Sequence, residues 1–228
     1  MEKKKYELCL EVLGRFQKAG ILNNIILIGS WCLYFYHDYF SGLSYTPSIR
    51  TRDIDFLVPL PPKFKKKIDI PKLLEDLGFI VEFIGSKGCI RLGHPELIVE
   101  FLVPERGRQS DKPFPLPQIG LNAQPLRFLD FLAGNTIEVN FHNSKIRLPH
   151  PAAFALHKLI IHSRRTKTEK AIKDKAQALM LLDLLLKKGE TKALQFIFAK
   201  MPAKWRKNVL AVLEKLDETV IFDILKGN

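Results

Sequence analysis

The stretch "ILIGSWCLYFYHDYF" at residues 26–40 decides how the chain begins to fold, because small residues interrupt an apolar run. Ile25 to Ile28 predicts a short buried strand, and the aromatic segment Trp31 to Phe40 has the length of a helix. Gly29 and Ser30 lie between the two. We therefore expect a strand that turns through a glycine into a helix.

A second stretch, "SIRTRDIDFLV" at residues 48–58, carries two aspartates at the start of another apolar run. Ile54 to Val58 predicts a buried strand. Asp53 and Asp55 lie at its beginning, where a buried strand gains nothing from charge. These two carboxylates therefore need a compensating partner.

The composition predicts a soluble, cytoplasmic protein with a sizeable core. The chain has 228 residues, 46% of them hydrophobic, which is enough for one large domain or two modest ones. No apolar run approaches the roughly 20 residues that span a bilayer, and the charged N-terminal segment does not resemble a signal peptide. The three cysteines are scattered and lack metal-ligand spacing, which argues against a disulfide framework. We expect no membrane partner.

The positive charge is concentrated in the C-terminal part of the chain. The net charge is +12, and the segment from His150 onward holds 16 Lys and Arg against 8 Asp and Glu. This surplus suits a polyanion such as a nucleotide or RNA, although basic helical surfaces are often only solvated. Both interpretations stay open for Lys158, Arg164, Arg165, Lys170, Lys173 and Lys175.

Hydrophobic periodicity divides the chain near residue 149 into an α/β domain, residues 1–149, and a basic helical domain, residues 150–228. The expected helices of the first domain are Lys5 to Ala19 and Lys72 to Leu77, and its further expected strands are "FIVEFI", "GCIRLG", "ELIVEFLVP", Arg127 to Phe131, Ile137 to Asn140 and Lys145 to Leu148. Arg106 to Gln118 is rich in proline and charge and predicts an exposed loop. After "LPHP" the apolar residues recur at helical spacing, with breaks at Gly189 and Pro202.

Asp53 and Asp55 predict a metal site. They are two residues apart on a predicted strand, so their side chains project to the same face and can converge on one cation. Magnesium prefers oxygen ligands and keeps water and substrate phosphates in its shell, so Mg²⁺ or Mn²⁺ is the expected cofactor. Glu100 interrupts an apolar strand and is the best candidate for a third acid, with Glu96 and Glu138 as weaker ones.

Gly29 and Ser30 predict a phosphate site, because a turn of small residues between a strand and a helix exposes backbone N–H groups to phosphate oxygens. Metal-binding carboxylates opposite such a turn are typical of nucleotidyl transfer. Each feature alone has a simpler interpretation: Gly-Ser is also common in plain turns, and Asp-x-Asp in solvated loops.

The order of these motifs resembles the nucleotidyltransferase fold shared by DNA polymerase β and kanamycin nucleotidyltransferases. The segments that carry the resemblance are "LIGSWCLYFY", "RTRDIDFLV" and "ELIVEFLVP". The segments "FLVPERGR", "AQPLRFLDFL", "LPHPAAFALHKLIIHSRR" and "KAIKDKAQALMLL" further resemble a bacterial family of nucleotidyltransferase-fold proteins related to abortive-infection toxins. The resemblance implies an α+β fold, in which a mixed sheet flanked by helices is followed by a C-terminal helical bundle.

The resemblance also implies roles for the motif residues. Gly29 and Ser30 would hold the triphosphate, and Asp53, Asp55 and Glu100 would bind the divalent metals. Glu100 stands where relatives usually have aspartate, and it would also activate the attacking hydroxyl.

Three residues of the helical domain resemble the Lys…Arg…Asp arrangement of the abortive-infection nucleotidyltransferases. By that resemblance Lys158 and Arg164 would meet phosphate oxygens of the nucleotide, and Asp174 would orient a basic group or a substrate hydroxyl. One departure is the long interval between Ser30 and Asp53, which contains the bulky "YFYHDYFSGLSY" segment.

The leading hypothesis is a metal-dependent nucleotidyltransferase that moves a nucleoside monophosphate from an NTP, such as ATP, to a hydroxyl on RNA, protein or a small molecule. The alternative is a noncatalytic protein of the same fold that binds nucleic acid or a neighbouring regulatory protein, as one component of a toxin–antitoxin pair. A metal-dependent glycosyltransferase ranks last, because no nucleotide-sugar strand pattern is evident.

Overall fold

The computed structural model describes residues 2–46, 51–105, 107, 112–142, 144–166 and 168–227. The chain forms two compact units. The first comprises residues 1–37 and 46–148, and the second comprises residues 38–45 and 149–228. The expected domains at 1–149 and 150–228 stay a prediction, because independent folding is a different property from compactness.

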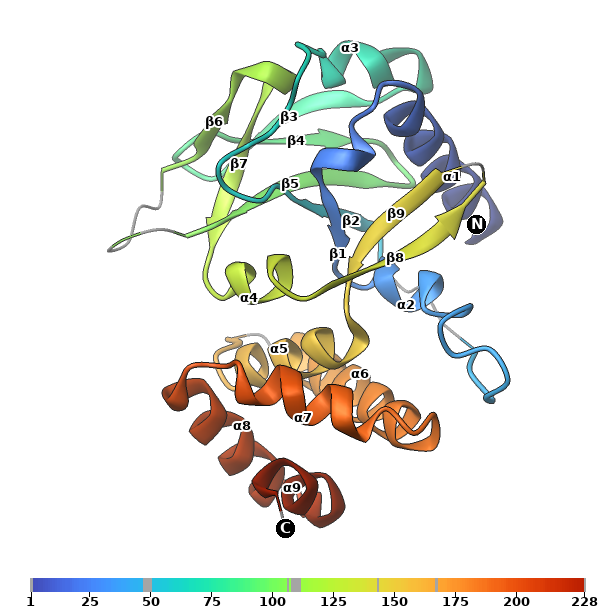
Figure 1. Ribbon diagram of the computed structural model, residues 1–228. Coiled ribbons are helices and arrows are strands. Elements are labelled where there is room, and N and C mark those ends of the chain that lie inside the picture. The colour runs from blue at the N-terminus through green and yellow to red at the C-terminus, as the bar shows by residue number, and fades with distance from the viewer. Residues whose placement is uncertain are drawn as a thin grey trace. The chain divides into compact units, whose positions relative to one another are not determined.

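A seven-stranded mixed sheet is the centre of the first unit (Figure 1). Its main path runs β1-β2-β5-β4-β3, with β7 paired to β5 and β6. The strands are β1 (Ile26–Ile28), β2 (Asp53–Leu57), β3 (Ile80–Ile84), β4 (Cys89–Gly93), β5 (Ile98–Pro104), β6 (Phe114–Leu116) and β7 (Leu121–Leu126). The pairs β2–β5 and β5–β7 are parallel and the others antiparallel, which confirms the expected mixed sheet.

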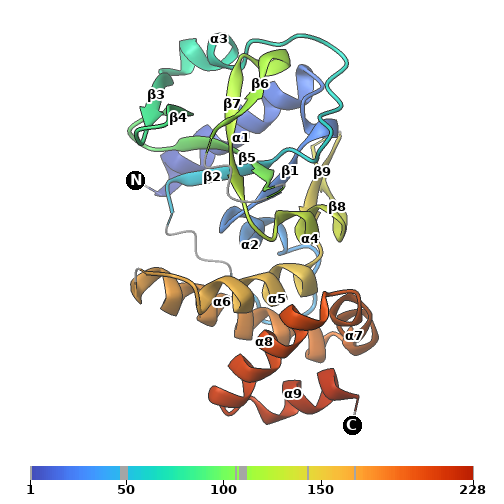
Figure 2. The ribbon, with the colours of Figure 1, turned by 90° about the vertical axis from the view of Figure 1, so that its left-hand side faces the viewer.

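Helix α1 (Glu2–Lys18) supplies the apolar cover for one face of this sheet (Figure 2). The Phe16 ring lies 5.3 Å from that of Phe56 on β2 and 6.2 Å from that of Phe101 on β5, measured between centroids. Phe56 and Phe101 stack at 5.6 Å. Because strand side chains alternate, this packing directs the other residues of β2 and β5 to the opposite face.

The short helices of the first unit are η1 (Leu22–Asn24), α2 (Trp31–Phe35), α3 (Ile70–Leu74), η2 (Glu75–Leu77), η3 (Pro117–Ile119) and α4 (Leu129–Ala133). The expected helix near Lys72 is confirmed as α3 and η2. It begins where the Asp69 side chain accepts a hydrogen bond from the Lys72 amide at 3.1 Å, and ends at Gly78, whose φ is 86°. Both are common helix-end signals.

Three expectations about local structure were wrong. The segment expected to be a strand from Arg127 contains α4, because a short apolar run fits a helix as well as a strand. The loop expected over Arg106 to Gln118 lies partly outside the described residues, and its described part forms β6 and η3. Proline is tolerated in β6 because this strand pairs only with β7. Helix α2 ends at Phe35 rather than Phe40.

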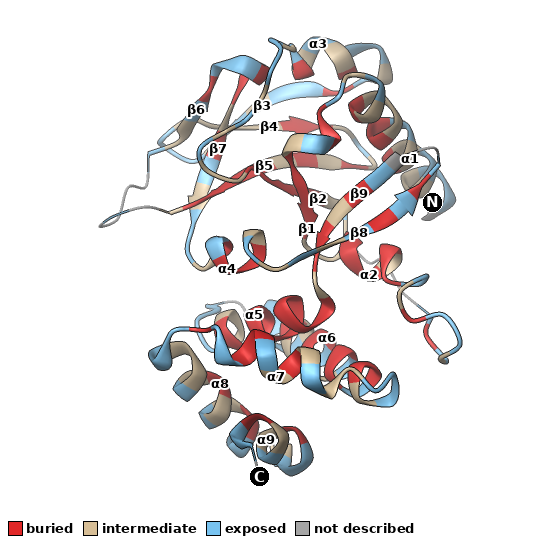
Figure 3. Ribbon diagram, viewed as in Figure 1, coloured by how far each residue is buried: buried red, intermediate tan, exposed pale blue. Residues whose placement is uncertain are grey.

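The second unit is a bundle of helices (Figure 1). They are α5 (Pro151–His162), α6 (Thr168–Lys187), α7 (Thr191–Ala199), α8 (Ala203–Lys215) and α9 (Thr219–Lys226). Helix α5 contacts α6, α7 and α8 and is buried over most of its length (Figure 3). The expected breaks at Gly189 and Pro202 are confirmed, and the α+β fold with a C-terminal helical bundle is confirmed with them.

A hairpin of β8 (Thr136–Phe141) and β9 (Ser144–Pro149) forms a separate two-stranded sheet, as the sequence predicts for these segments. Arg147 ties it to the N-terminal region by donating from Nη2 to the Asn23 carbonyl at 3.1 Å. Among the helices described here, none combines the length and the apolar character needed to cross a membrane.

Candidate active site

Asp53, Asp55 and Glu100 lie on one face of the large sheet. Asp55 is directly opposite Glu100 in the parallel pairing of β2 with β5, and Asp53 precedes Asp55 by two residues. Their face is the one opposite the aromatic core, so all three side chains are half-buried. The structure therefore brings the three predicted acids to one face.

The Gly29 turn lies against the carboxylate of Asp55. Ile28 pairs with Asp55 in the antiparallel ladder, and Gly29 then adopts a φ of 75°. A Cβ placed on Gly29 would lie 2.2 Å from Asp55 Oδ2, far inside contact distance. Both the left-handed backbone and this close approach exclude a side chain at residue 29, so the turn lies directly against the Asp55 carboxylate.

Ser30 stands at the start of α2. The first helical hydrogen bond runs from the Cys32 amide to the Gly29 carbonyl at 3.2 Å, so the amides of Ser30 and Trp31 precede the helical ladder. Helix α2 is only five residues long, which weakens the contribution expected from a helix dipole. The binding capacity of this turn therefore rests on its N–H groups and the Ser30 hydroxyl.

The entry to β2 is held by short-range hydrogen bonds. The Asp53 amide donates to Thr51 Oγ1 at 3.2 Å. The Arg52 carbonyl accepts from the Ile98 amide at 2.8 Å, and the Arg52 guanidinium donates to the His94 carbonyl at 2.9 Å. These bonds anchor the start of β2 to the β4–β5 turn and thus fix the backbone that carries Asp53.

The donor set fits a magnesium ion that shares its shell with substrate. Among the described residues, no group of three or more His, Cys, Asp or Glu side chains is arranged to hold a metal. Asp53 and Asp55 still offer two carboxylates from one strand. Mg²⁺ is usually held by one or two carboxylates together with phosphate and water oxygens, so this pair suits it.

The two weaker candidates for the third acid lie elsewhere. Glu96 is in the turn between β4 and β5, where its amide donates to His94 Nδ1 at 3.1 Å. Glu138 is on β8 of the small sheet and forms an ion pair with Lys145 at 3.1 Å. Neither is in register with Asp55, which leaves Glu100 as the acid that the strand pairing supports.

The strand register adds Arg91 and Glu82, two residues that the sequence reasoning missed. Arg91 on β4 is opposite Glu100 on one side and Glu82 of β3 on the other. The signal was available, because each is an isolated charge inside an otherwise apolar strand, as Glu100 is. Only the pairing of the strands shows that the three share a row.

In the helical unit, Lys158 and Asp174 form a buried ion pair. Lys158 Nζ lies 2.5 Å from Asp174 Oδ1, and the two side chains are 9% and 4% exposed. Arg165 Nε binds the other carboxylate oxygen at 2.8 Å. Burial acts to raise the pKa of Asp174, but Lys158 and Arg165 hold it below its ordinary value.

This arrangement bears on the predicted nucleotide contacts of the helical unit. The structure brings Lys158 and Asp174 together and adds Arg165 to them, while Arg164 is exposed in the turn after α5. Contact of Lys158, Arg164 and Asp174 with nucleotide stays a prediction. A phosphate that bound Lys158 would compete with Asp174 for the ammonium group.

His157 is buried next to this cluster. Its Nε2 has no hydrogen-bond partner within the described part of the chain. Burial, assisted by the charge of Lys158, lowers the pKa of His157 to about 3. The ring is therefore neutral at physiological pH, which agrees with a packing role rather than acid–base chemistry.

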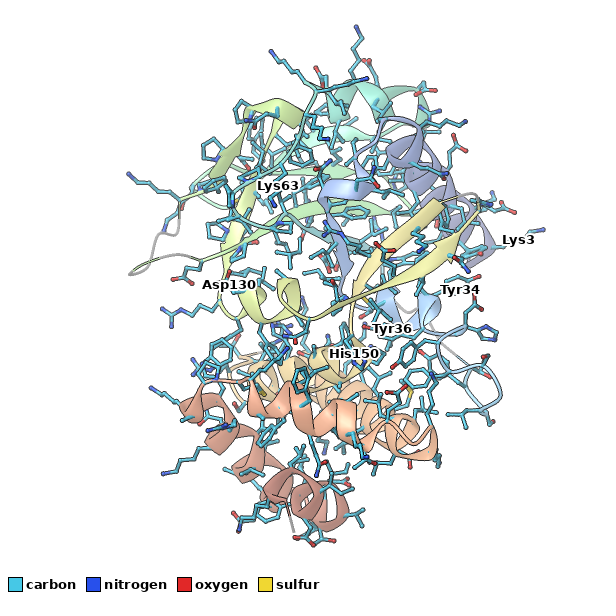
Figure 4. All side chains as sticks on the ribbon, in the orientation of Figure 1. Lys3, Tyr34, Tyr36, Lys63, Asp130 and His150 are labelled. Carbon is cyan, nitrogen blue, oxygen red and sulfur yellow. The ribbon has the colours of Figure 1, made fainter. Side chains whose placement is uncertain are left out.

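The long segment between the two motifs has a defined place in the helical unit, through Tyr39 and His150. His150 lies at the start of α5 (Figure 4), where its Nδ1 accepts from the Ala152 amide at 3.1 Å. The proton is therefore on Nε2, which donates to Tyr39 Oη at 3.2 Å. Lys188 Nζ lies 3.9 Å from the centre of the Tyr39 ring. Burial and then Glu190 raise the pKa of Tyr39, so its hydroxyl stays protonated.

Comparison with known proteins gives a family match over most of the chain. The sequence model of a family described as nucleotidyltransferase matches residues 7–203. No curated protein matches the sequence significantly.

Two solved structures are similar to this chain. The crystal structure of an antigenic nucleotidyltransferase-like protein from Paracoccidioides brasiliensis is 15% identical, with a TM-score of 0.52 over 92% of this chain and 88% of that one. The solution structure of the antibiotic-resistance factor ANT(2'')-Ia is 12% identical, with a TM-score of 0.48 over 96% of both chains.

Proposed function

The chain belongs to the nucleotidyltransferase family, and we propose that it moves a nucleoside monophosphate from an NTP, such as ATP, to a hydroxyl group. The observation that carries this proposal is the contact between Gly29 and the Asp55 carboxylate, with Glu100 opposite Asp55 on the next strand. In this proposal the turn would bind phosphate oxygens and the paired carboxylates would bind a metal ion beside the same α-phosphate.

Asp53 and Asp55 would hold Mg²⁺ or Mn²⁺, since both carboxylates project from the same face of β2. The bound ion would offset negative charge on the phosphate oxygens. The two aspartates are half-buried, so they can bind an ion without exposing the apolar core beneath them. The role of this chain is mainly to position charge, as is usual in phosphoryl and nucleotidyl transfer.

Gly29 and Ser30 would bind the triphosphate. The missing side chain at Gly29 lets phosphate oxygens approach the turn next to Asp55, and the N–H groups before Cys32 and the Ser30 hydroxyl can donate to them. That Lys158 and Arg164 meet phosphate oxygens of the nucleotide, with Asp174 as an orienting group, stays a prediction.

Glu100 would accept the proton of the attacking hydroxyl. The acceptor oxygen forms a bond to the α-phosphorus, the bond from this phosphorus to the bridging oxygen breaks, and pyrophosphate leaves with the electron pair. RNA, protein and small molecules all provide suitable hydroxyls. A toxin–antitoxin role and a neighbouring regulatory protein stay predictions.

The test uses ATP labelled with ³²P at either the α or the γ position, incubated with the protein, Mg²⁺ or Mn²⁺, and cellular RNA, protein and metabolites. Nucleotidyl transfer would label an acceptor only when the ATP carries ³²P at the α position. Repeating this experiment with the other three α-labelled NTPs shows which base is preferred. Asp55→Asn should lower this transfer at least about 100-fold, since it removes one preorganised charge.

Glu138→Gln provides the matched control. It also neutralises a strand carboxylate, but one that is paired with Lys145 on the small sheet. Transfer should stay near the wild-type rate in this variant. Equal activity of Asp55→Asn and the wild type would refute the assignment of Asp55, and label from the γ position would indicate phosphoryl transfer instead.

A further inference from the structure

The row of side chains across the large sheet continues beyond the three acids. In order along β2, β5, β4 and β3 it contains Asp55, Glu100, Arg91 and Glu82, each opposite the next. Directly opposed residues project to the same face of a sheet. The Gly29 turn touches the Asp55 end of this row, so Arg91 lies on the far side of Glu100 from the turn.

Arg91 is held in place by a specific contact. Its Nε lies 2.6 Å from Glu82 Oε2, and the Arg91 side chain is 30% exposed. A Cβ on Gly93 would lie 2.3 Å from Glu82 Oε1, so the Glu82 carboxylate fills space that only a glycine leaves. A guanidinium has five N–H donors, and the contact with Glu82 uses one of them.

The turn next to Arg91 is also positioned by hydrogen bonds and carries a second cation. Asn122 on β7 accepts from the Ile90 amide at 2.8 Å and donates to the Gly88 carbonyl at 3.0 Å. Lys87 is exposed in this turn. Beyond Glu100, β4 therefore carries Arg91, and the turn that precedes β4 carries Lys87.

We propose that Arg91, supported by Lys87, binds a negatively charged group of the acceptor, so that the acceptor carries a phosphate near its reactive hydroxyl. This inference rests on the proposed function. The attacking and leaving oxygens lie roughly in line on opposite sides of the phosphorus. With the triphosphate at the Gly29 end of the row, the acceptor enters from the Arg91 end.

The side chains of Arg91 and Lys87 favour an anionic ligand. The planar fork of a guanidinium matches two phosphate oxygens, and Glu82 fixes its orientation through Nε. Glu82 and Glu100 lie on either side of Arg91, so Arg91 and Lys87 carry two positive charges against two negative ones, and recognition depends on the geometry of the guanidinium rather than on net local charge. The net charge of +12 also favours the approach of anions over that of polycations.

The experiment compares three acceptors: a short oligoribonucleotide with a free 3′ hydroxyl, ribose 5-phosphate, and ribose. The first two represent the two sources of a phosphate-bearing hydroxyl, and the third lacks phosphate. The full chain and the variants Arg91→Gln and Arg91→Lys are assayed for transfer from α-labelled ATP. Binding of the same acceptors is measured separately, by fluorescence anisotropy for the oligoribonucleotide and calorimetry for the sugars.

Arg91→Gln should raise the KM for the preferred phosphate-bearing acceptor about 10-fold, the loss expected for a charge-assisted hydrogen bond, and leave the KM for ATP unchanged. Arg91→Lys should restore part of the loss. The control is Arg127→Gln. Arg127 Nε lies 3.2 Å from Glu105 Oε2, in a similar ion pair that is not part of this row. It should leave both KM values unchanged.

Several results would overturn the proposal: use of ribose as readily as ribose 5-phosphate, an effect of Arg91→Gln on the KM for ATP alone, or unchanged acceptor binding in a variant that melts like the wild type. If neither the wild type nor any variant labels these acceptors or the cellular acceptors of the earlier test, the proposed function is refuted. The binding measurement still decides in that case whether Arg91 recognises a phosphate-bearing hydroxyl compound.

Discussion

Replacement of Asp174 by alanine should destabilise the helical unit strongly. The variant removes the carboxylate that lies 2.5 Å from Lys158 Nζ, where the two side chains are 9% and 4% exposed. Loss of one partner of a buried ion pair costs about 3–5 kcal/mol, because the other charge is left buried and unpaired. The Arg165 side chain is 38% exposed, so its share is screened by solvent and adds at most about 1 kcal/mol.

The measurement is thermal and urea unfolding of Asp174→Ala beside Asp183→Ala. Asp183 is on the same helix and lies 2.6 Å from Lys187, but these side chains are 56% and 61% exposed. Asp183→Ala should change the free energy of unfolding by less than about 0.5 kcal/mol. Asp174→Ala should lower the melting temperature by about 10 °C, given 2–4 °C per kcal/mol for chains of this size.

A double variant separates the loss of charge from the loss of packing. Lys158→Met with Asp174→Leu replaces both charges by apolar side chains, and its stability should return to within about 1–2 kcal/mol of the wild type. If Asp174→Ala unfolds like Asp183→Ala, the reasoning from burial is refuted. The folded double variant also tests the predicted nucleotide contact, because ATP binding should weaken only if Lys158 meets the phosphates.

Two further predictions concern Gly29 and His157. Gly29→Ala should abolish transfer and destabilise the first unit by more than about 1 kcal/mol, because the new Cβ would overlap Asp55 Oδ2; Gly20→Ala, at a φ of 74° with open space around it, should show only the backbone cost in unfolding assays. His157 has a folded pKa of about 3 against an ordinary value of 6.5, so its contribution to stability is complete above pH 6.5 and is lost as pH falls toward 3. Urea titrations should show about 2 kcal/mol lost between pH 7 and pH 5, and His157→Gln should reduce this dependence whereas the exposed His142→Gln should not.

The pattern of apolar residues predicted those strands and helices whose buried positions can be recognised within a single element. Strand β5 reads as a strand because it is apolar on both sides of Glu100, and the periodicity of α6 follows from its single buried stripe. Strand β6 was missed because it has two neighbouring prolines and exists only through its pairing with β7.

The candidate site shows the same contrast between features set within one strand and features set by the pairing of strands. The two-residue spacing of Asp53 and Asp55 is sufficient to place both carboxylates on one face. The opposition of Asp55 and Glu100 depends on the register of two strands that are distant in the chain, and nothing local to either strand sets it. The close approach of Gly29 to Asp55 needs the register of β1 with β2 and the φ of the turn, so no local sequence pattern contained it.

The candidate residues predicted from the sequence differ most in the free-energy cost of binding a ligand. Asp53 and Asp55 are half-buried at the start of β2, so a ligand can reach them without entering the apolar core. Asp174 is buried with Lys158 and Arg165, and a phosphate that took Lys158 would leave this carboxylate short of a partner in a dry environment. We therefore expect the chemistry to depend on the sheet residues, and substitutions in the helical cluster to act first through stability. A variant of this cluster that melts like the wild type yet loses ATP binding would contradict this expectation.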